Sequence, residues 1–151
     1  MNKKRIISIA AAMVLSLGLL SGCGNKNALK DGVYKSEFSK LDSKGWKAQL
    51  SIEVKDGKIV SSNYDYVNKD GKLKTQDEEY NKKMEAKSKT NPIKYTDQLE
   101  KQLVEKQDPA KVDAVTGATS SSKNFTELAN AAIEKAKKGD TATAVIEEKG
   151  K

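Results

Sequence analysis

The chain has 151 residues, with 28 Lys and Arg against 21 Asp and Glu, and its formal net charge is +7. It contains no histidine and one cysteine, which excludes imidazole acid–base catalysis, histidine-ligated metal sites and an intramolecular disulfide. Its basic residues are spread along the chain instead of forming a block with aromatic residues, so no nucleic-acid partner is indicated. We therefore expect that the protein is not an enzyme and that it has neither catalytic residues nor a metal site of its own.

The first 22 residues are predicted to be a targeting segment. A basic start, with Lys3, Lys4 and Arg5, precedes an uncharged apolar stretch at 6–20, which is shorter than the about 20 residues of a comfortable membrane span. Small residues then lead directly to Cys23. An ordinary secretory signal that happens to precede a cysteine is the alternative interpretation.

This order of residues resembles a bacterial lipoprotein signal. The resemblance implies that Cys23 receives a diacylglycerol thioether and becomes the mature N-terminus. Acyl chains would then hold the protein at the extracytoplasmic face of the cell membrane.

The remaining 129 residues carry a formal charge of +4, because the first 22 contain three basic residues and no acidic one. This length predicts one domain with a modest core. We expect a lipidated tether at 23–30, the folded domain at 31–138 and a flexible tail at 139–151.

Three stretches alternate apolar and polar residues, as half-buried strands do: 32–38, 46–54 and 59–67. Asp56 and Gly57 form a favoured two-residue hairpin turn, because both positions tolerate a positive φ. Residues 68–71 suggest a second turn. The pattern predicts an antiparallel meander of at least three strands, with these side chains grouped by face: Tyr34 with Phe38, and Val60 with Tyr64 and Tyr66.

Two helices are predicted in the polar middle of the chain. Thr75 with Glu78 has the spacing of a capping box and opens a helix that runs to about Lys89. A second helix, capped by Thr96, ends before Asp108.

A third helix carries an apolar stripe over 125–136, and Gly139 can supply its left-handed C-cap. Ser121 or Ser122 could cap its start, and Asn124 with Glu127 is an alternative. The fold class is therefore α+β, an antiparallel meander packed with about three α-helices.

The stretch Asp113-Ala-Val-Thr-Gly-Ala-Thr119, followed by three serines, leads into this third helix. It brings hydroxyl groups to a helix N-terminus, whose free N–H groups and partial positive charge favour a phosphate. A hydroxyl-rich turn that only caps the helix is the alternative.

The order Asp-x-x-Thr-Gly-Ala-Thr resembles the flavinylation motif of the FMN-binding domain family, found in subunits of sodium-pumping and Rnf-type redox complexes and in flavin-bearing lipoproteins. A looser resemblance covers 31–138. It implies an FMN-binding-domain-like fold and an FMN joined through its phosphate to the hydroxyl of Thr119. The residues that the motif assigns to cofactor binding are Asp113, Thr116, Gly117, Ala118, Thr119 and Ser120.

Each motif position suggests a role. Gly117 and Ala118 carry almost no side chain, so the flavin phosphate and a modifying enzyme could approach the backbone. Thr116 could hydrogen-bond the phosphate or the loop. Asp113 would repel a phosphate, so we expect it either to brace the loop by accepting N–H bonds or to be read by the modifying enzyme.

The resemblance also implies partners. A separate flavin transferase would take FMN from FAD with magnesium. A membrane dehydrogenase or quinone-linked donor would supply electrons, and a soluble or extracellular acceptor would receive them. The flavin ring needs a flat or apolar contact, for which the sequence offers four candidates, each of which fits the core better than a ring contact: Trp46, Tyr64, Tyr66 and Tyr95.

Two alternative functions remain open. One keeps the fold but binds FMN or another small ligand reversibly, without a role in electron transfer. The other concerns the targeting segment, because residues 15–22 resemble the apolar pheromone peptides released from some enterococcal lipoprotein signals.

Overall fold

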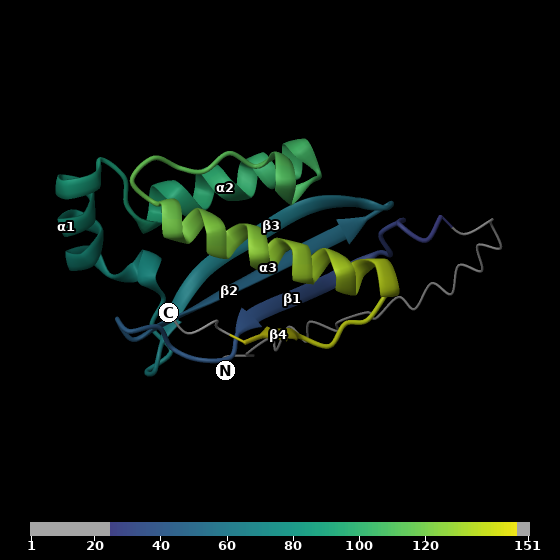
Figure 1. Ribbon diagram of the computed structural model, residues 1–151, viewed down its shortest axis with the longest axis horizontal. Helices are drawn as coiled ribbons and strands as arrows, with labels where there is room; N and C mark the ends of the chain where they lie inside the picture. Colours follow the sequence, from purple (N-terminus) through teal and green to yellow (C-terminus); the bar gives the residue numbers. More distant parts are fainter. Residues whose placement is uncertain (1–24, 148–151) are drawn as a thin grey trace, which may run out of the picture.

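The computed structural model describes residues 25–147, so the predicted targeting segment and Cys23 lie outside the described residues. A four-stranded sheet carries two long helices on one face, and a shorter helix stands at one end (Figure 1). The predicted α+β class is confirmed.

The first three strands form the predicted antiparallel meander. They are β1 (Gly32–Phe38), β2 (Trp46–Lys55) and β3 (Lys58–Asn68), and the order across the sheet is β3-β2-β1-β4. The hairpin between β2 and β3 turns through Asp56 and Gly57, both with positive φ, as predicted.

The C-terminal segment differs from the expected flexible tail. Residues Ala144–Ile146 form strand β4, which pairs in parallel with the outer edge of β1. The N–H of Ser39 also donates to the carbonyl oxygen of Ile146 (2.8 Å). Valine and isoleucine favour extended backbone, and the open edge of β1 gives them hydrogen-bond partners.

The prediction for Val60 is wrong. Val60 is 45% exposed, whereas its neighbour Ile59 is buried with the apolar face of β3. The register shifts at this point, because Glu53 pairs with Ser61 but the next residue of β2 pairs with Ile59. Val60 is therefore the extra residue of a β-bulge, which turns it away from the core.

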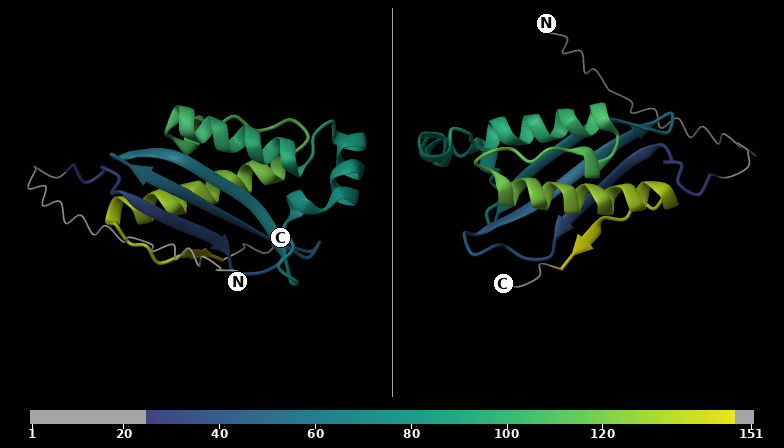
Figure 2. Two further views of the ribbon diagram at one scale, coloured as in Figure 1. Left: turned by 180° about the vertical axis from the view of Figure 1, so that it is seen from behind. Right: turned by 45° about the horizontal axis from the view of Figure 1, so that its top comes forward.

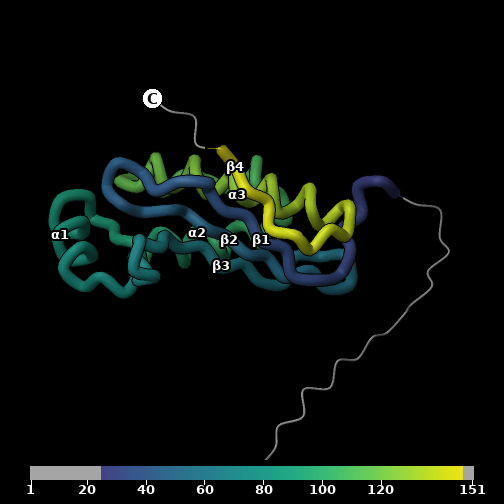
Figure 3. The backbone as a smooth tube through the Cα atoms, turned by 90° about the horizontal axis from the view of Figure 1, so that it is seen from below, coloured from purple at the N-terminus to yellow at the C-terminus, as the bar shows by residue number. Residues whose placement is uncertain are grey.

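The helices follow in the order η1 (Lys74–Gln76), α1 (Glu78–Ser88), α2 (Pro92–Lys106), η2 (Pro109–Lys111) and α3 (Thr119–Lys138). Figure 2 shows α2 and α3 over the same face of the sheet, and Figure 3 shows α1 projecting beyond one end. Among residues 25–147, no helix is both long and apolar enough to cross a bilayer.

Two of the predicted helix caps are wrong. The side chain of Asp77, not Thr75, accepts the N–H of Tyr80 and caps α1. Asn91, not Thr96, caps α2, because Pro92 is preorganised for the first helical position and has no N–H to lose.

The core lies between the sheet and the two long helices. It is filled by buried apolar side chains from both layers, among them Tyr34, Leu50, Ile52, Tyr64, Leu99, Leu103, Phe125 and Leu128. Alanines at 129, 132 and 136 let α3 lie close to the sheet, and Ser36 Oγ on β1 donates to the carbonyl oxygen of Leu128 (2.8 Å). The end of the predicted tether is also held, because the N–H of Lys30 donates to Ala136 O (3.0 Å).

The side chains of Glu100 on α2 and of Gln107, which follows α2, satisfy the free edge of β3. Glu100 Oε1 accepts the N–H of Tyr64 (2.7 Å). The amide of Gln107 accepts the N–H of Ile59 (2.8 Å) and donates to its carbonyl oxygen (2.7 Å), as a neighbouring strand would. These contacts fix α2 against the sheet and cover an edge that could otherwise pair with another chain.

Glu100 should make stability depend on pH. Burial, with Asp97 and Asp65 nearby, raises its pKa from 4.5 to about 7. As pH rises through this window the unfolded chain loses the proton first, so the folded state is progressively destabilised and the loss is complete above the folded pKa. Glu100→Gln keeps the acceptor for Tyr64 and removes the titration. The free energy of unfolding of this variant in urea, relative to that of wild type, should therefore rise by about 1–3 kcal/mol between acidic and mildly alkaline pH.

Glu105→Gln, an exposed carboxylate on the same helix, is the matched control. Its stability relative to wild type should vary much less with pH. If the free energy of unfolding varied with pH in the same way for wild type and Glu100→Gln, Glu100 would not be the source of the pH dependence.

Candidate functional site

The predicted motif occupies the loop between η2 and the start of α3. Val115 to Ala118 make a tight turn, in which the N–H of Ala118 donates to the carbonyl oxygen of Val115 (2.9 Å). Gly117 is the third residue of this turn and has φ +85°, a conformation that side chains other than glycine rarely adopt.

Gly117 is also the point where the loop touches α1. A Cβ atom there would lie 2.5 Å from the carbonyl oxygen of Ser88 and 3.2 Å from Cγ2 of Thr90. We expected the missing side chain to leave room for a flavin phosphate. Instead the last residue of α1 fills that space, so glycine is needed for packing as well as for the turn.

Ser122 holds the loop from the other side. It is buried in the first turn of α3, where its Oγ accepts the N–H of Val115 (2.9 Å) and donates to the carbonyl oxygen of Ala118 (2.9 Å). The sequence suggested Ser122 only as a possible cap, because nothing in the pattern showed that its hydroxyl reaches back seven residues.

α3 begins at Thr119, earlier than any of the predicted caps. Ala118 occupies the cap position and offers no side-chain acceptor; the first N–H to bond within the helix is that of Ser122, to Ala118 O. Within the described residues, no protein acceptor takes the N–H groups of Thr119, Ser120 or Ser121. The side chains of Thr116, Thr119 and Ser120 are exposed, so hydroxyls and free N–H donors lie together at the positive end of a 20-residue helix.

Asp113 is fixed by α2. Gln102 accepts its N–H (2.9 Å) and donates to its carbonyl oxygen (3.2 Å), while Lys106 Nζ lies 2.7 Å from its Oδ2. Lys106 also donates to the carbonyl oxygen of Lys111 (2.8 Å). The expectation that the Asp113 carboxylate accepts loop N–H groups is not met in the described part of the chain, because the Lys106 ammonium takes this place.

The carboxylate of Asp113 remains largely open to solvent, with 82% of the side chain exposed. Recognition by a modifying enzyme therefore stays a prediction. Sequence reasoning missed Gln102 and Lys106, although their spacing puts them on one face of α2.

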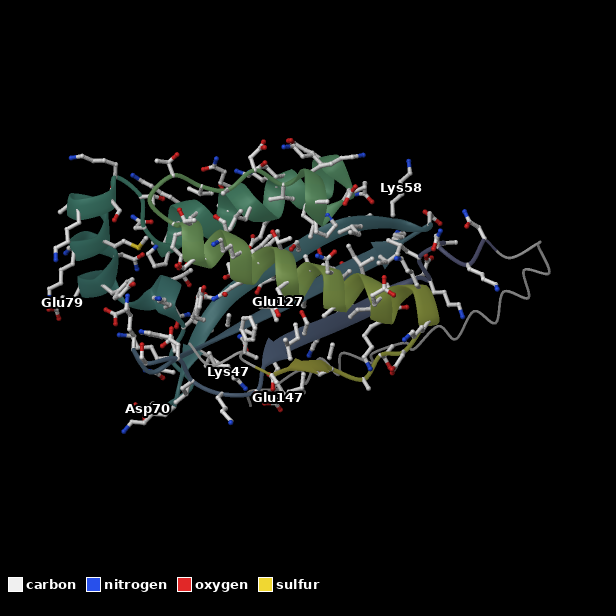
Figure 4. All side chains as sticks on the ribbon, viewed as in Figure 1. Lys47, Lys58, Asp70, Glu79, Glu127 and Glu147 are labelled. Carbon is white, nitrogen blue, oxygen red and sulfur yellow. The ribbon has the colours of Figure 1, made fainter. Side chains whose placement is uncertain are left out.

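A groove of about 440 Å³ runs beside Thr119 between α2, the loop and α3. Its walls come from α2 and the loop (Leu99, Val112, Ala114) and from one face of α3 (Thr119, Ser122, Lys123, Thr126, Glu127, Asn130). Figure 4 marks Glu127 along this helix. The distance along α3 from Thr119 to Asn130 is about 16 Å. A larger hollow of 520 Å³ between α1 and α2 contains none of the motif residues.

The four aromatic candidates for a ring contact all belong to the core. Trp46, Tyr64, Tyr66 and Tyr95 are buried, and none lines the groove. Two of them support the site from beneath: the Tyr64 and Tyr66 hydroxyls lie 2.8 Å apart, and Tyr64 Oη donates to the carbonyl oxygen of Ser121 (2.9 Å). Burial raises the pKa of Tyr64 well above its usual value, so the Tyr64 hydroxyl stays neutral and ties the start of α3 to β3.

The site fits a phosphorylated small ligand. Three free N–H groups and the helix dipole can hold a phosphate, and the adjoining groove is within the size range of small-ligand pockets. Among the described residues, no group of three His, Cys, Asp or Glu side chains could hold a metal ion.

Gly117→Ala should destabilise the fold by about 1–3 kcal/mol for the left-handed φ, and by more for the displacement of Ser88. Gly71→Ala is the matched control, because Gly71 has φ +79° but open space around its Cβ position. The difference between the two variants in urea unfolding isolates the contact with α1. Equal losses of unfolding free energy in Gly117→Ala and Gly71→Ala would contradict the close packing of Gly117 against Ser88.

Ser122→Ala should leave the buried N–H of Val115 without an acceptor, at a cost of about 1–3 kcal/mol. Amide hydrogen exchange should show Val115 exchanging faster in this variant. Ser120→Ala, which removes an exposed hydroxyl, should leave that exchange rate unchanged. Unaltered protection of Val115 in Ser122→Ala would show that the hydroxyl does not hold the loop.

Comparisons with known proteins agree with this geometry. Residues 44–134 match the family described as FMN-binding domain. The "15 kDa lipoprotein" of Treponema pallidum (strain Nichols) is 37% identical over 126 residues, which cover 83% of this chain and 89% of that protein. The crystal structure of the CPE2226 protein from Clostridium perfringens is similar with a TM-score of 0.77 and 43% identity, over 80% of this chain and 99% of that one. The chain therefore belongs to the FMN-binding domain family.

Proposed function

We propose that this protein is a lipid-anchored, extracytoplasmic flavoprotein that relays electrons through an FMN joined to Thr119 by a phosphoester. One observation carries the proposal: Thr119, the last residue of the motif, is exposed on the first turn of α3, among free N–H groups and beside a groove.

The chain's own residues would hold and orient the cofactor. Thr119 Oγ would be the esterified oxygen: it would lose its proton and bond to the FMN phosphorus of FAD, while the pyrophosphate bond of FAD breaks and AMP leaves. The N–H groups of residues 119–121 and the helix dipole would offset the charge that remains on the phosphate. The groove between α2 and α3 would receive part of the flavin, with Val112 and Ala114 on its apolar side.

FMN would supply the redox chemistry, since flavins exchange one or two electrons. Among residues 25–147 there is no histidine or cysteine that could act as a nucleophile or proton shuttle beside Thr119. A separate flavin transferase would attach the cofactor, and the exposed Asp113 carboxylate is available to it. The electrons would come from a membrane dehydrogenase or a quinone-linked donor and pass to a soluble or extracellular acceptor.

Acylation of Cys23 would place this carrier at the membrane. The sequence before Cys23 supports this assignment, as does the similarity to a protein that is itself named a lipoprotein. Covalent attachment of both lipid and flavin would keep the carrier and its cofactor at the cell surface without relying on affinity.

Co-expression with a flavin transferase should add the mass of one FMN less one water to the wild-type protein. Thr119→Val should abolish this gain, whereas Thr141→Val, which removes an exposed hydroxyl outside the motif, should retain it. Intact-mass spectrometry of the three purified proteins makes the comparison, and urea unfolding confirms that each variant is folded.

Two results would contradict the assignment. A folded wild-type protein that gains no mass would exclude covalent flavin, and flavin that copurifies without a mass gain would favour reversible binding.

For the electron-relay role, the loaded protein is reduced with dithionite under argon and mixed with ferric citrate. The flavin absorbance should return; a flavin that stays reduced would contradict the relay.

A further inference from the structure

The chain enters the fold at the end of α3 that lies opposite Thr119. The N–H of Lys30 donates to the carbonyl oxygen of Ala136 (3.0 Å), in the last turns of α3. Asp31 Oδ1 accepts the N–H of Gly57 (3.1 Å), in the hairpin between β2 and β3. The entering segment, the C-terminus of α3 and this hairpin therefore form one end of the domain (Figure 1).

Exposed lysines gather at this end, on the entering segment, the hairpin and the last turn of α3: Lys26, Lys30, Lys55, Lys58 and Lys138. Within residues 25–147, none of the five forms an ion pair with a carboxylate, and they outnumber the two exposed carboxylates on the same segments, Asp31 and Asp56. We call this group the lysine end. Figure 4 shows Lys58 on this part of the molecule and Glu79 at the far end, on α1.

The proposed lipid anchor has a short reach. Cys23 precedes Lys30 by seven residues, which span at most about 25 Å when fully extended. Thr119 lies at the other end of the 20-residue α3, about 28 Å along the helix from its last residue. An anchor at Cys23 thus brings the lysine end within reach of the bilayer surface.

We propose that the lysine end docks on the anionic headgroups of the bilayer, so that α3 points away from the membrane and presents Thr119 at its outer tip. The proposal rests on the acylation of Cys23 in the proposed function. Attraction between lysines and headgroups acts within a Debye length, about 8–10 Å at physiological salt, and the anchor allows the lysines to come that close. α1 also carries exposed lysines, but they lie at the opposite end.

This orientation determines which partners reach the flavin. A cofactor on Thr119 faces the solution, where soluble or extracellular acceptors can approach it. A membrane-bound donor has to extend about the length of α3 from the bilayer to reach the same site.

The test uses lipidated protein in vesicles of phosphatidylcholine with phosphatidylglycerol, or of phosphatidylcholine alone. Since acylation consumes the thiol of Cys23, an introduced cysteine is the single labelling site. A fluorophore is attached either at Val60→Cys, next to the hairpin, or at Glu79→Cys on α1, and nitroxide headgroup lipids quench it. In anionic vesicles, quenching should be several-fold stronger for the fluorophore at position 60 than for the fluorophore at position 79, and high salt should reduce the difference.

Charge variants separate the lysine end from general basicity. In the Val60→Cys protein, Lys55→Gln, Lys58→Gln and Lys138→Gln together should lower the preference for the docked orientation about tenfold or more. The matched triple Lys69→Gln, Lys82→Gln and Lys87→Gln removes the same charge from the far end and should leave quenching at 60 unchanged.

Equal quenching at 60 and 79, the same pattern in neutral vesicles, or an equal effect of both triples would overturn the proposal. Flotation of the same samples with the vesicles measures anchoring, and their intact mass measures flavin. Protein that floats but shows no preference contradicts the orientation alone, whereas protein that does not float contradicts the anchor and the orientation together. Neither result depends on the presence of flavin.

Discussion

The contact between Gly117 and the carbonyl oxygen of Ser88 is the constraint on which the geometry of the motif loop depends. It requires a residue without a side chain and a left-handed φ at the same point. With α1 holding the loop on this side and Ser122 on the other, the turn has little freedom. The N-terminus of α3 is therefore held between these contacts, with Thr119 exposed and its N–H group without an acceptor in the described part of the chain.

The rest of the fold positions the helices that contact this loop. α2 is fixed along β3 by Glu100 and Gln107, and the same helix reaches the start of the motif through Gln102 and Lys106. α3 is fixed to the sheet by small residues and by the tyrosine hydroxyls beneath its first turn. The groove beside Thr119 follows from the separation that these contacts set between the two helices. These contacts form the scaffold that presents the Thr119 hydroxyl.

Local patterns were enough to predict the meander, the Asp56–Gly57 turn and the glycine C-cap of α3, because alternation and turn chemistry act over a few residues. The motif could be located by its residue order. The contacts that shape it could not be predicted, since Ser88 and Lys106 are joined to the loop only by tertiary structure. The same holds for β4, whose three residues are stable as a strand only beside β1.

The most direct test of the account is peptide mass spectrometry of the mature protein isolated from membranes of the cells that produce it. Fragmentation can assign FMN to one hydroxyl among the four that lie together in the loop and first turn: Thr116, Thr119, Ser120 and Ser121. The account predicts FMN on Thr119 alone, in a protein whose N-terminal peptide carries lipid on Cys23. FMN on any of the other three, or no flavin on an intact acylated chain, would contradict it.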